Sequence, residues 1–459
     1  MTTYHPDTSF QFSLGRTLRL SSFHIGSAMG DILVTSIWNR IMISNFGIPA
    51  TPVSLLIALR YLLFPISLWA GFLSDTKPLF GLRRTPYIWL GRAMMVISLP
   101  LLGLSLGRLE LVQTDFLGWT YATVSSLLYG VGLLISGSPF LALVRDSAPK
   151  AKQGIAISTV QTALIVFFAV VGIGFSFWMQ AYDERIFWQM ALTTLIGGGI
   201  LWYLSIAGVE KRILAHNKIE LLSEPDGPNL ALFWQTFQKI GADPRTRGFF
   251  IFLSLATAAA WAQDAILEPF GAETFNLPVS QTTRFNAYWQ GATVITLIGG
   301  AYLWRKRPPE TQSSITSGGL IVMFTGMALL AAATLLGQVR LLEPALLIFG
   351  GGFGVYTFGG LSLMAVMSSE KEAGLYLGLW TIAVTVFKGL GVFLGGAMRD
   401  LFLLNLALPA SLAYGVVFSL EALGLLVAAL ILAQVNVLSF AEDVGRFVSR
   451  TEAQIAGAD

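Results

Sequence analysis

Long apolar segments recur along this chain between residues 22 and 434, and they constrain its fold more than any other feature. Several carry no charged residue over more than twenty positions, among them 153–182, 311–339 and 344–369. A helix needs roughly 20 apolar residues to cross a ~30 Å hydrocarbon core. Inside that core the backbone must satisfy its own hydrogen bonds, which favours helices. We therefore predict an all-α integral membrane protein that crosses the bilayer many times.

Composition narrows the functions that are open to the chain. Hydrophobic residues make up 54% of it and charged residues only 12%, about half the share in a soluble protein. It has no cysteine, which excludes disulfides and thiolate chemistry. The first twenty residues are polar and mixed, so no cleavable signal peptide is expected. The sequence shows no phosphate-binding loop, catalytic triad or metal-ligand cluster. We therefore expect a protein that is not an enzyme and binds neither nucleotide nor nucleic acid.

The apolar segments predict twelve spanning helices, six on each side of a long polar loop. This divides the chain into an N-terminal half at 1–209, a linker at 210–247 and a C-terminal half with a polar tail at 248–459. Two six-helix halves are the architecture of the major facilitator transporters. The predicted spans are 22–44, 51–74, 87–107, 117–144, 153–178, 187–209, 248–269, 285–304, 317–338, 344–367, 373–398 and 410–434.

Basic residues predict the orientation of these spans. One set of alternate loops holds 21 Lys and Arg residues, and the other holds five, which are Arg108, Arg185, Arg284, Arg340 and Arg399. Cytoplasmic loops are the ones enriched in Lys and Arg. The richer set is therefore predicted to be cytoplasmic, together with both termini and the linker.

The loop between the second and third predicted spans resembles the major facilitator loop motif. Gly71, Asp75 and Gly81 occur in order, and the basic pair Arg83 and Arg84 follows them. The stretch from Asp75 to Gly81 is longer than in the usual motif. Glycine permits close helix approach, and Asp75 can cap a helix or pair with the arginines. An ordinary positively charged inside loop is the alternative interpretation.

The seventh predicted span ends in an acidic segment. Asp264 and Glu268 are four residues apart, which places both on one face of a continuous helix. Pro269 and Gly271 predict that the helix ends beside them. Two carboxylates at membrane depth need partners or water. A proton or cation relay, oxygen ligands for a metal or a pigment magnesium, and a charge pair at the outer helix end all stay open. Position alone favours the last.

The segment from Gln263 to Glu273 resembles the bacteriochlorophyll delivery family, the PucC-like branch of the major facilitators. Segments at 39–50, 74–91 and 143–149 resemble the same family, and the resemblance covers nearly all twelve spans. It implies a protein that carries or inserts chlorophyll or bacteriochlorophyll during assembly of light-harvesting or reaction-centre complexes. It also implies partners among those subunits and the pigment-biosynthesis enzymes. The implied location is the inner, intracytoplasmic or thylakoid membrane of a phototrophic bacterium.

A chlorin magnesium takes an axial nitrogen or oxygen ligand, and few histidines are present to supply one. His24 lies at the inner end of the first span, whereas His5 and His216 lie in polar segments. An interfacial position without ligation is the alternative for His24. We expect few pigment copies, held loosely. The other candidate ligands are Gln161, Gln263, Asn286, Gln290 and the carboxylates Asp264 and Glu268.

Four further ionisable side chains lie within predicted spans: Asp31, Arg60, Lys388 and Glu421. A charge that faces lipid is costly, so each should face the protein interior or a partner. Asp31 and Arg60, on neighbouring spans, are predicted to pair, either to fix helix packing or to serve transport. The glycines that follow Lys388 permit a flat macrocycle or another helix to approach, and helix packing is the commoner reason.

Two other functions stay open beside pigment delivery. One is proton-coupled transport of a small solute that uses Asp31, Asp264 or Glu268. The other is a static scaffold for an antenna subunit or a pigment enzyme. An absorption spectrum of the protein purified in mild detergent separates them, because pigment delivery alone predicts co-purified red-absorbing pigment.

The charge asymmetry yields a test of orientation. A single cysteine placed by Ser223→Cys in the predicted cytoplasmic linker should react with an impermeant thiol reagent only after the inner face is opened. The background is clean because the native chain has no cysteine. Labelling from the outside of intact cells would overturn the predicted orientation.

Overall fold

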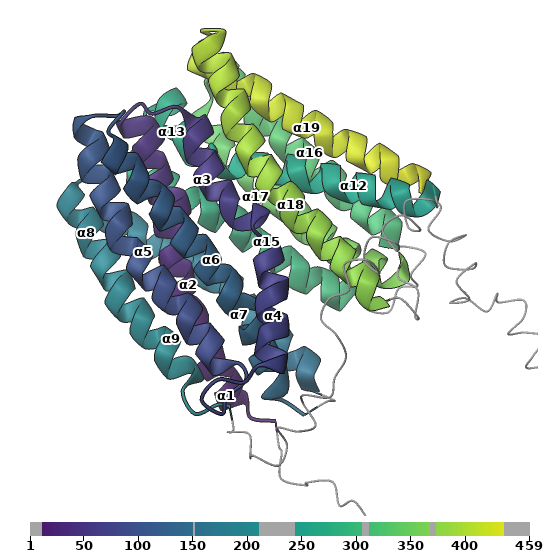
Figure 1. Ribbon diagram of the computed structural model, residues 1–459. Coiled ribbons are helices and arrows are strands. Elements are labelled where there is room, and N and C mark those ends of the chain that lie inside the picture. Colours follow the sequence, from purple (N-terminus) through teal and green to yellow (C-terminus); the bar gives the residue numbers. More distant parts are fainter. Residues whose placement is uncertain (1–11, 150–151, 211–243, 305–311, 368–372, 436–459) are drawn as a thin grey trace, which may run out of the picture. The chain divides into compact units, whose positions relative to one another are not determined.

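The computed structural model describes residues 12–149, 152–210, 244–304, 312–367 and 373–435, and these are helical almost throughout (Figure 1). His5, His216, Ser223 and the linker therefore lie outside the described residues, apart from the linker's ends. The described part divides into two compact units. The first comprises the residues up to 210 together with Gly271–Ala287, and the second comprises the residues from 244 to Phe270 and from Tyr288 onward.

The predicted spans of the N-terminal half all fall on helices. Three depart from a regular α-helix. The first and the sixth contain π-helical segments, and the second is divided near Leu63. The elements are α1 (Leu14–Ser21), α2 (Phe23–Asp31), η1 (Ile32–Trp38), η2 (Ile41–Asn45), α3 (Ala50–Leu62), α4 (Pro65–Thr76), α5 (Thr85–Leu111), α6 (Phe116–Asp146), α7 (Gln153–Trp178), α8 (Glu184–Thr193), η4 (Thr194–Gly198) and α9 (Gly199–Ile206).

The predicted spans of the C-terminal half also fall on helices, and the last of them ends at the residues predicted. The elements are α12 (Pro244–Trp261), η6 (Ala262–Ala265), α13 (Leu267–Phe275), α14 (Val279–Thr282), α15 (Arg284–Trp304), α16 (Gln312–Leu335), η8 (Val339–Leu341), α17 (Leu342–Met367), α18 (Ala373–Asp400), η9 (Leu401–Asn405) and α19 (Ala410–Gln434).

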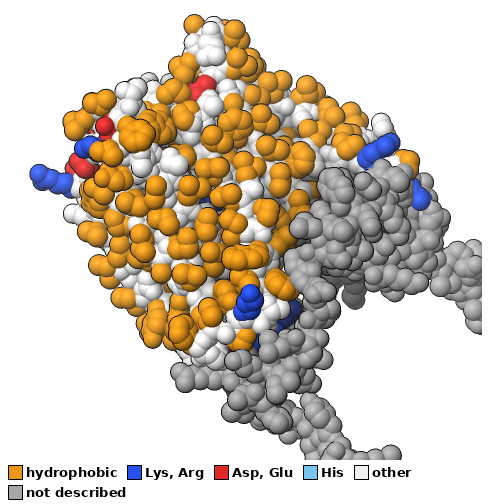
Figure 2. Space-filling view, in the orientation of Figure 1, with side chains coloured by type: hydrophobic (Ala, Val, Ile, Leu, Met, Phe, Trp, Pro, Cys, Tyr) orange, Lys and Arg blue, Asp and Glu red, His pale blue; other side chains and the backbone are white. Residues whose placement is uncertain are grey.

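Helix length and surface composition agree with a membrane protein. Among the described residues, nine helices are long and apolar enough to cross a bilayer, and the bent pair of α12–η6 with α13 makes a tenth. Apolar side chains cover most of the described surface in Figure 2, and the few charged ones lie toward its edges. Ile295 and Leu303 on α15, for example, are exposed in the isolated chain. Such a surface is stable when lipid covers it.

The seventh span does not end where Pro269 and Gly271 predicted. Both residues lie inside α13, and the interruption comes earlier, at the 3₁₀ segment η6. The axes of α12–η6 and α13 differ by 49°. Proline is tolerated here because it occupies the first turn of α13, where its missing N–H would have no partner in the helix.

Small residues set the spacing between neighbouring helices. Gly132 on α6 lies against α5, where an added Cβ would come within 3.0 Å of the Met95 side chain and within 3.1 Å of that of Met94. On α16, an added Cβ at Gly319 or Gly326 would meet the backbone of α17. Glycine permits such approach between membrane helices, where packing replaces the hydrophobic driving force.

This packing yields a paired test on one helix. Gly132→Val should lower the thermal stability of the protein in detergent, because overpacking a tight contact costs about 1–3 kcal/mol. Gly137→Val is the matched control, since a Cβ at Gly137 would meet no atom within 4 Å. Equal melting temperatures for the two variants would contradict the close α5–α6 contact.

Candidate functional site

A buried ion pair joins α2 to α3, as predicted for Asp31 and Arg60. Nη1 of Arg60 lies 2.8 Å from Oδ1 of Asp31, and the arginine is 7% exposed. The hydroxyl of Tyr129 on α6 donates to the same oxygen at 2.9 Å. Nη2 of Arg60 donates to the Tyr61 hydroxyl at 2.5 Å. Asp31 thus has two donors from two other helices.

Tyr129 was not predicted, although a tyrosine in the middle of an apolar span is a usable signal. A buried phenol needs a hydrogen-bond partner, and Asp31 supplies it. Glycines make the cluster possible, because an added Cβ at Gly30 would come within 2.7 Å of the Tyr129 hydroxyl, and one at Gly130 within 2.8 Å of the Arg60 Cβ. Removing either charge would leave the other uncompensated at depth.

His24 lies near this cluster in sequence but in different surroundings. Its side chain, on α2, is 6% exposed and stands edge-on to Phe140 of α6, with ring centroids 5.3 Å apart. Phe23 stacks on Phe140 at 3.8 Å, and the Arg92 guanidinium lies 4.2 Å from the Phe23 ring. Within the described part of the chain, neither ring nitrogen of His24 has a hydrogen-bond partner. His24 is therefore an enclosed imidazole with its ligating atoms uncommitted.

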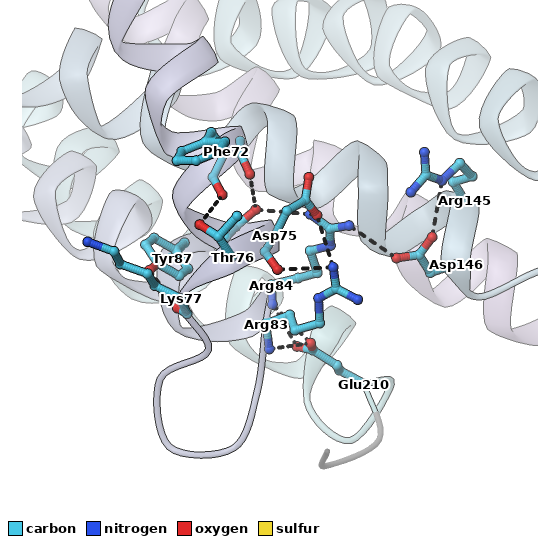
Figure 3. A network of polar contacts seen from close by, with 12 residues as sticks. Phe72, Asp75, Thr76, Lys77, Arg83, Arg84, Tyr87, Arg145, Asp146 and Glu210 are labelled. Carbon is cyan, nitrogen blue, oxygen red and sulfur yellow. Dashed lines mark hydrogen bonds and ion pairs between the residues drawn. The ribbon is translucent and has the colours of Figure 1, made fainter. Parts of the chain in front are cut away.

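The loop motif forms a network at the start of α5 (Figure 3). Arg84 pairs with Asp75, donates to Ser74 Oγ at 3.0 Å and approaches Asp146 of α6 at 3.5 Å. Arg83 donates to the Asp75 carbonyl at 3.0 Å. Asp75 thus pairs with the arginines, which is one of the two roles predicted for it.

A different residue caps the helix. The Glu210 carboxylate, just past α9, accepts the backbone N–H groups of Arg83, Arg84 and Thr85 at 2.6–3.1 Å, and also the Thr85 hydroxyl at 2.7 Å. These amides belong to the N-terminus of α5, which carries partial positive charge. Glu210 therefore joins the end of the sixth span to the start of the third.

The longer spacing within the motif has a structural explanation. Leu79 and Leu82 exchange two backbone hydrogen bonds of 2.9 Å, and the residues between them, Phe80 and Gly81, have positive φ of 55° and 76°. Positive φ at both central residues is characteristic of a tight type I′ turn. The extra residues of the motif therefore form a short hairpin, and Gly81 is needed for its conformation.

In the second unit, the broken span is packed closely by α18. Lys388 Nζ lies 3.2 Å from the centroid of the Trp261 ring, a cation–π contact at the end of α12. Gly391 lies against the backbone of Ala258, and Gly395 against that of Ala262. The glycines after Lys388 thus let another helix approach closely. Helix packing was the commoner of the two reasons predicted for them.

The break changes the geometry expected for the two carboxylates. Asp264 lies in η6 and Glu268 in the first turn of α13, so no continuous helix places both on one face. That prediction was wrong because the chain turns between them. Glu268 is 1% exposed, whereas Asp264 is half-buried. The two side chains thus occupy different environments.

Two buried polar side chains lie at this break or on the helix beside it. Gln263 is 1% exposed, and Glu421 on α19 is 2% exposed. Among the described residues, neither the amide atoms of Gln263 nor the carboxyl oxygens of Glu421 have a hydrogen-bond partner. The other predicted amide ligands do not combine full burial with a missing hydrogen-bond partner. Gln161 is exposed, Gln290 is half-buried, and Asn286 donates to Ser36 Oγ at 3.2 Å.

Comparison with known proteins identifies the family. The family model described as PUCC protein matches residues 37–440. The chain belongs to the PucC family. It is 28% identical to Protein PucC of Rhodovulum sulfidophilum, covering 84% of this chain and 85% of that protein. It is 30% identical to the Bacteriochlorophyll synthase 44.5 kDa chain of Rhodobacter capsulatus, covering 87% and 90%.

Solved structures confirm the fold of this PucC family member. A point mutant of the nucleoside transporter NupG matches with a TM-score of 0.66 at 15% identity, covering 92% of this chain and 100% of that one. A bacterial homologue of the human lysosomal transporter Spinster matches with a TM-score of 0.64 at 14% identity, covering 94% and 96%. The chain therefore has the major facilitator fold predicted for it, and at such identities the likeness concerns the fold alone.

The network at α5 yields a stability prediction. Glu210→Gln should lower stability by about 1.5–3 kcal/mol, the usual worth of hydrogen bonds to a charged group. Asp75→Asn should lower stability or protein level without changing the identity of any bound pigment. Thermal unfolding in detergent measures both, and Glu184→Gln, an exposed carboxyl in the same unit, is the control. Normal stability of Asp75→Asn with selective loss of pigment would show that Asp75 is not structural.

Proposed function

We propose that this protein handles chlorophyll or bacteriochlorophyll, holding few copies and delivering them during assembly of light-harvesting or reaction-centre complexes. The observation that carries the proposal is the PUCC match over residues 37–440. A relative that matches over 87% of this chain is named for bacteriochlorophyll. The protein acts without catalysing a reaction, in a photosynthetic membrane, with both termini cytoplasmic. Its partners are pigment-binding subunits and pigment-biosynthesis enzymes.

The buried residues fit a chlorin in chemical type. A bound chlorin would supply a magnesium ion that accepts a nitrogen or oxygen ligand from the protein. His24 has two uncommitted ring nitrogens, and Gln263 has an uncommitted amide oxygen, among the described residues. Both side chains are buried, which keeps water from competing for the metal. His24 is the better candidate because aromatic rings already surround it.

The surroundings of His24 favour a neutral imidazole, which can ligate a metal. The Arg92 guanidinium lies over both Phe23 and Trp202, at 4.2 and 4.9 Å from their ring centroids. His24 is itself buried, and burial away from water favours the uncharged imidazole, because a charged side chain without a partner is costly there. Neutral imidazole is the form that ligates metals.

A second candidate function is proton-coupled transport of a small solute. The specific observation in its favour is the major facilitator fold shared with solved transporters. The buried Asp31–Arg60 pair is the kind of charge cluster that marks transport pathways. A static scaffold would have no use for uncommitted buried ligands.

The pigment proposal predicts a coloured protein. Purified in mild detergent from a phototrophic bacterium, the wild type should carry red-absorbing pigment. His24→Phe keeps an aromatic ring but removes both nitrogens, so the pigment bound per protein should fall by a factor on the order of ten or more. Absorption spectra normalised to protein measure this.

The control is His216→Phe, the same change outside the described residues, and it should keep its pigment. A colourless wild type that small solutes stabilise would favour the transporter instead. If the His24→Phe protein is still coloured, the protein binds pigment but His24 is not its ligand.

A further inference from the structure

Glu421 is an unusual residue for its position. It lies in the middle of α19, a helix of 25 residues in which it is the sole acidic or basic side chain. The carboxyl is 2% exposed, and within the described residues neither oxygen has a hydrogen-bond partner. An ionised carboxylate without a partner is among the most costly groups to bury, and such groups give up their charge instead.

The packing of α19 shows what Glu421 faces. One turn before it, Phe418 packs on Phe270 of α13, with ring centroids 4.9 Å apart. One turn after it, Gly424 lies against Ala259 of α12. Residues three apart share a helix face, so Glu421 points at the chain between residues 259 and 270. That stretch contains the break η6, which itself contacts α19.

Gln263 occupies this break. It is 1% exposed, and neither its amide nitrogen nor its amide oxygen has a partner among the described residues. A side-chain amide offers both a donor and an acceptor, so it can serve a neutral acid or a carboxylate. The break therefore places an uncommitted amide on the segment that Glu421 faces.

The charged groups around α19, within the described residues, leave Glu421 without a nearby cation. The helix α16 has no acidic or basic residue, and α12 carries only Arg245 and Arg247 near its start. On α18, Arg399 is 2.7 Å from Asp400, and Lys388 lies on Trp261. The break and α13 add the acidic groups Asp264, Glu268 and Glu273. Burial without a hydrogen-bond partner among the described residues therefore favours a protonated Glu421.

We propose that Glu421 and Gln263 form a proton-binding site at the break of the seventh span. In this site Glu421 holds a proton as a neutral carboxylic acid at neutral pH. Release transfers that proton to water and leaves a buried carboxylate. Because a carboxylate at this depth needs water, release is coupled to opening of the break. The site exists whether or not the protein carries pigment.

The test uses full-length protein from a non-photosynthetic host, so its outcome is independent of pigment. Infrared spectra of the wild type at neutral pH should show the carbonyl stretch of a protonated carboxyl. The band should vanish in Glu421→Gln. It should persist in Glu343→Gln, which alters an exposed carboxyl of α17 in the same unit.

Thermal unfolding across pH provides the second readout. Above the pH range in which a glutamate ordinarily titrates, the folded protein still holds a proton that the unfolded chain has released. Stability of the wild type should therefore fall as pH rises, by about tenfold in the unfolding equilibrium per pH unit. Glu421→Gln should lack this component, whereas Glu343→Gln should retain it.

Two outcomes would overturn the proposal. A wild type without a protonated carboxyl band means that Glu421 is ionised, and this result needs no variant. A band that survives Glu421→Gln means that another carboxyl holds the proton. If Glu421→Gln does not fold, Glu421→Asp is used in its place. A displaced carbonyl band then assigns the proton to position 421, and an unmoved band shows that another carboxyl holds the proton.

Discussion

The need to partner every polar group away from water governs this structure. The backbone meets it by forming helices, and the described residues are helical almost throughout. Side chains meet it through specific partners: Asp31 accepts from Arg60 and Tyr129, and Lys388 lies on the face of Trp261. Even the start of α5, on an interhelix loop, has its amides bound by Glu210. The exceptions to this rule are therefore informative.

Features that depend on local sequence could be predicted well. The spans expected at 153–178 and 410–434 coincide with α7 and α19, because the length of an apolar segment is a local property. The Asp31–Arg60 pair could be predicted because two charges on neighbouring spans have few other partners. Glu210 could not, because it binds the amides of residues more than a hundred positions away. Its only signal was an acidic residue directly after a span.

The broken seventh span shows where local signals mislead. Proline and glycine at 269 and 271 are typical of a helix end, yet they lie within α13. The interruption falls instead on residues 262–265, which include no proline or glycine. Close contact explains it better: α18 reaches the backbone of Ala258 and Ala262 through Gly391 and Gly395. Tertiary packing decides where this span bends, and no residue type within the bend predicts it.

Some buried polar groups have hydrogen-bond partners and others do not, and this difference bears on function. Asp31 and Arg60 are held by several hydrogen bonds, so that cluster has one strongly preferred arrangement. His24 in the same unit, and Gln263 and Glu421 in the second unit, are buried without such bonds among the described residues. Groups in that state gain free energy from a ligand, a proton or a rearrangement that supplies partners. Under the proposed carrier function, uptake and release of a cargo require a free-energy difference between two states. Groups with unmet partners next to a bent helix can supply that difference.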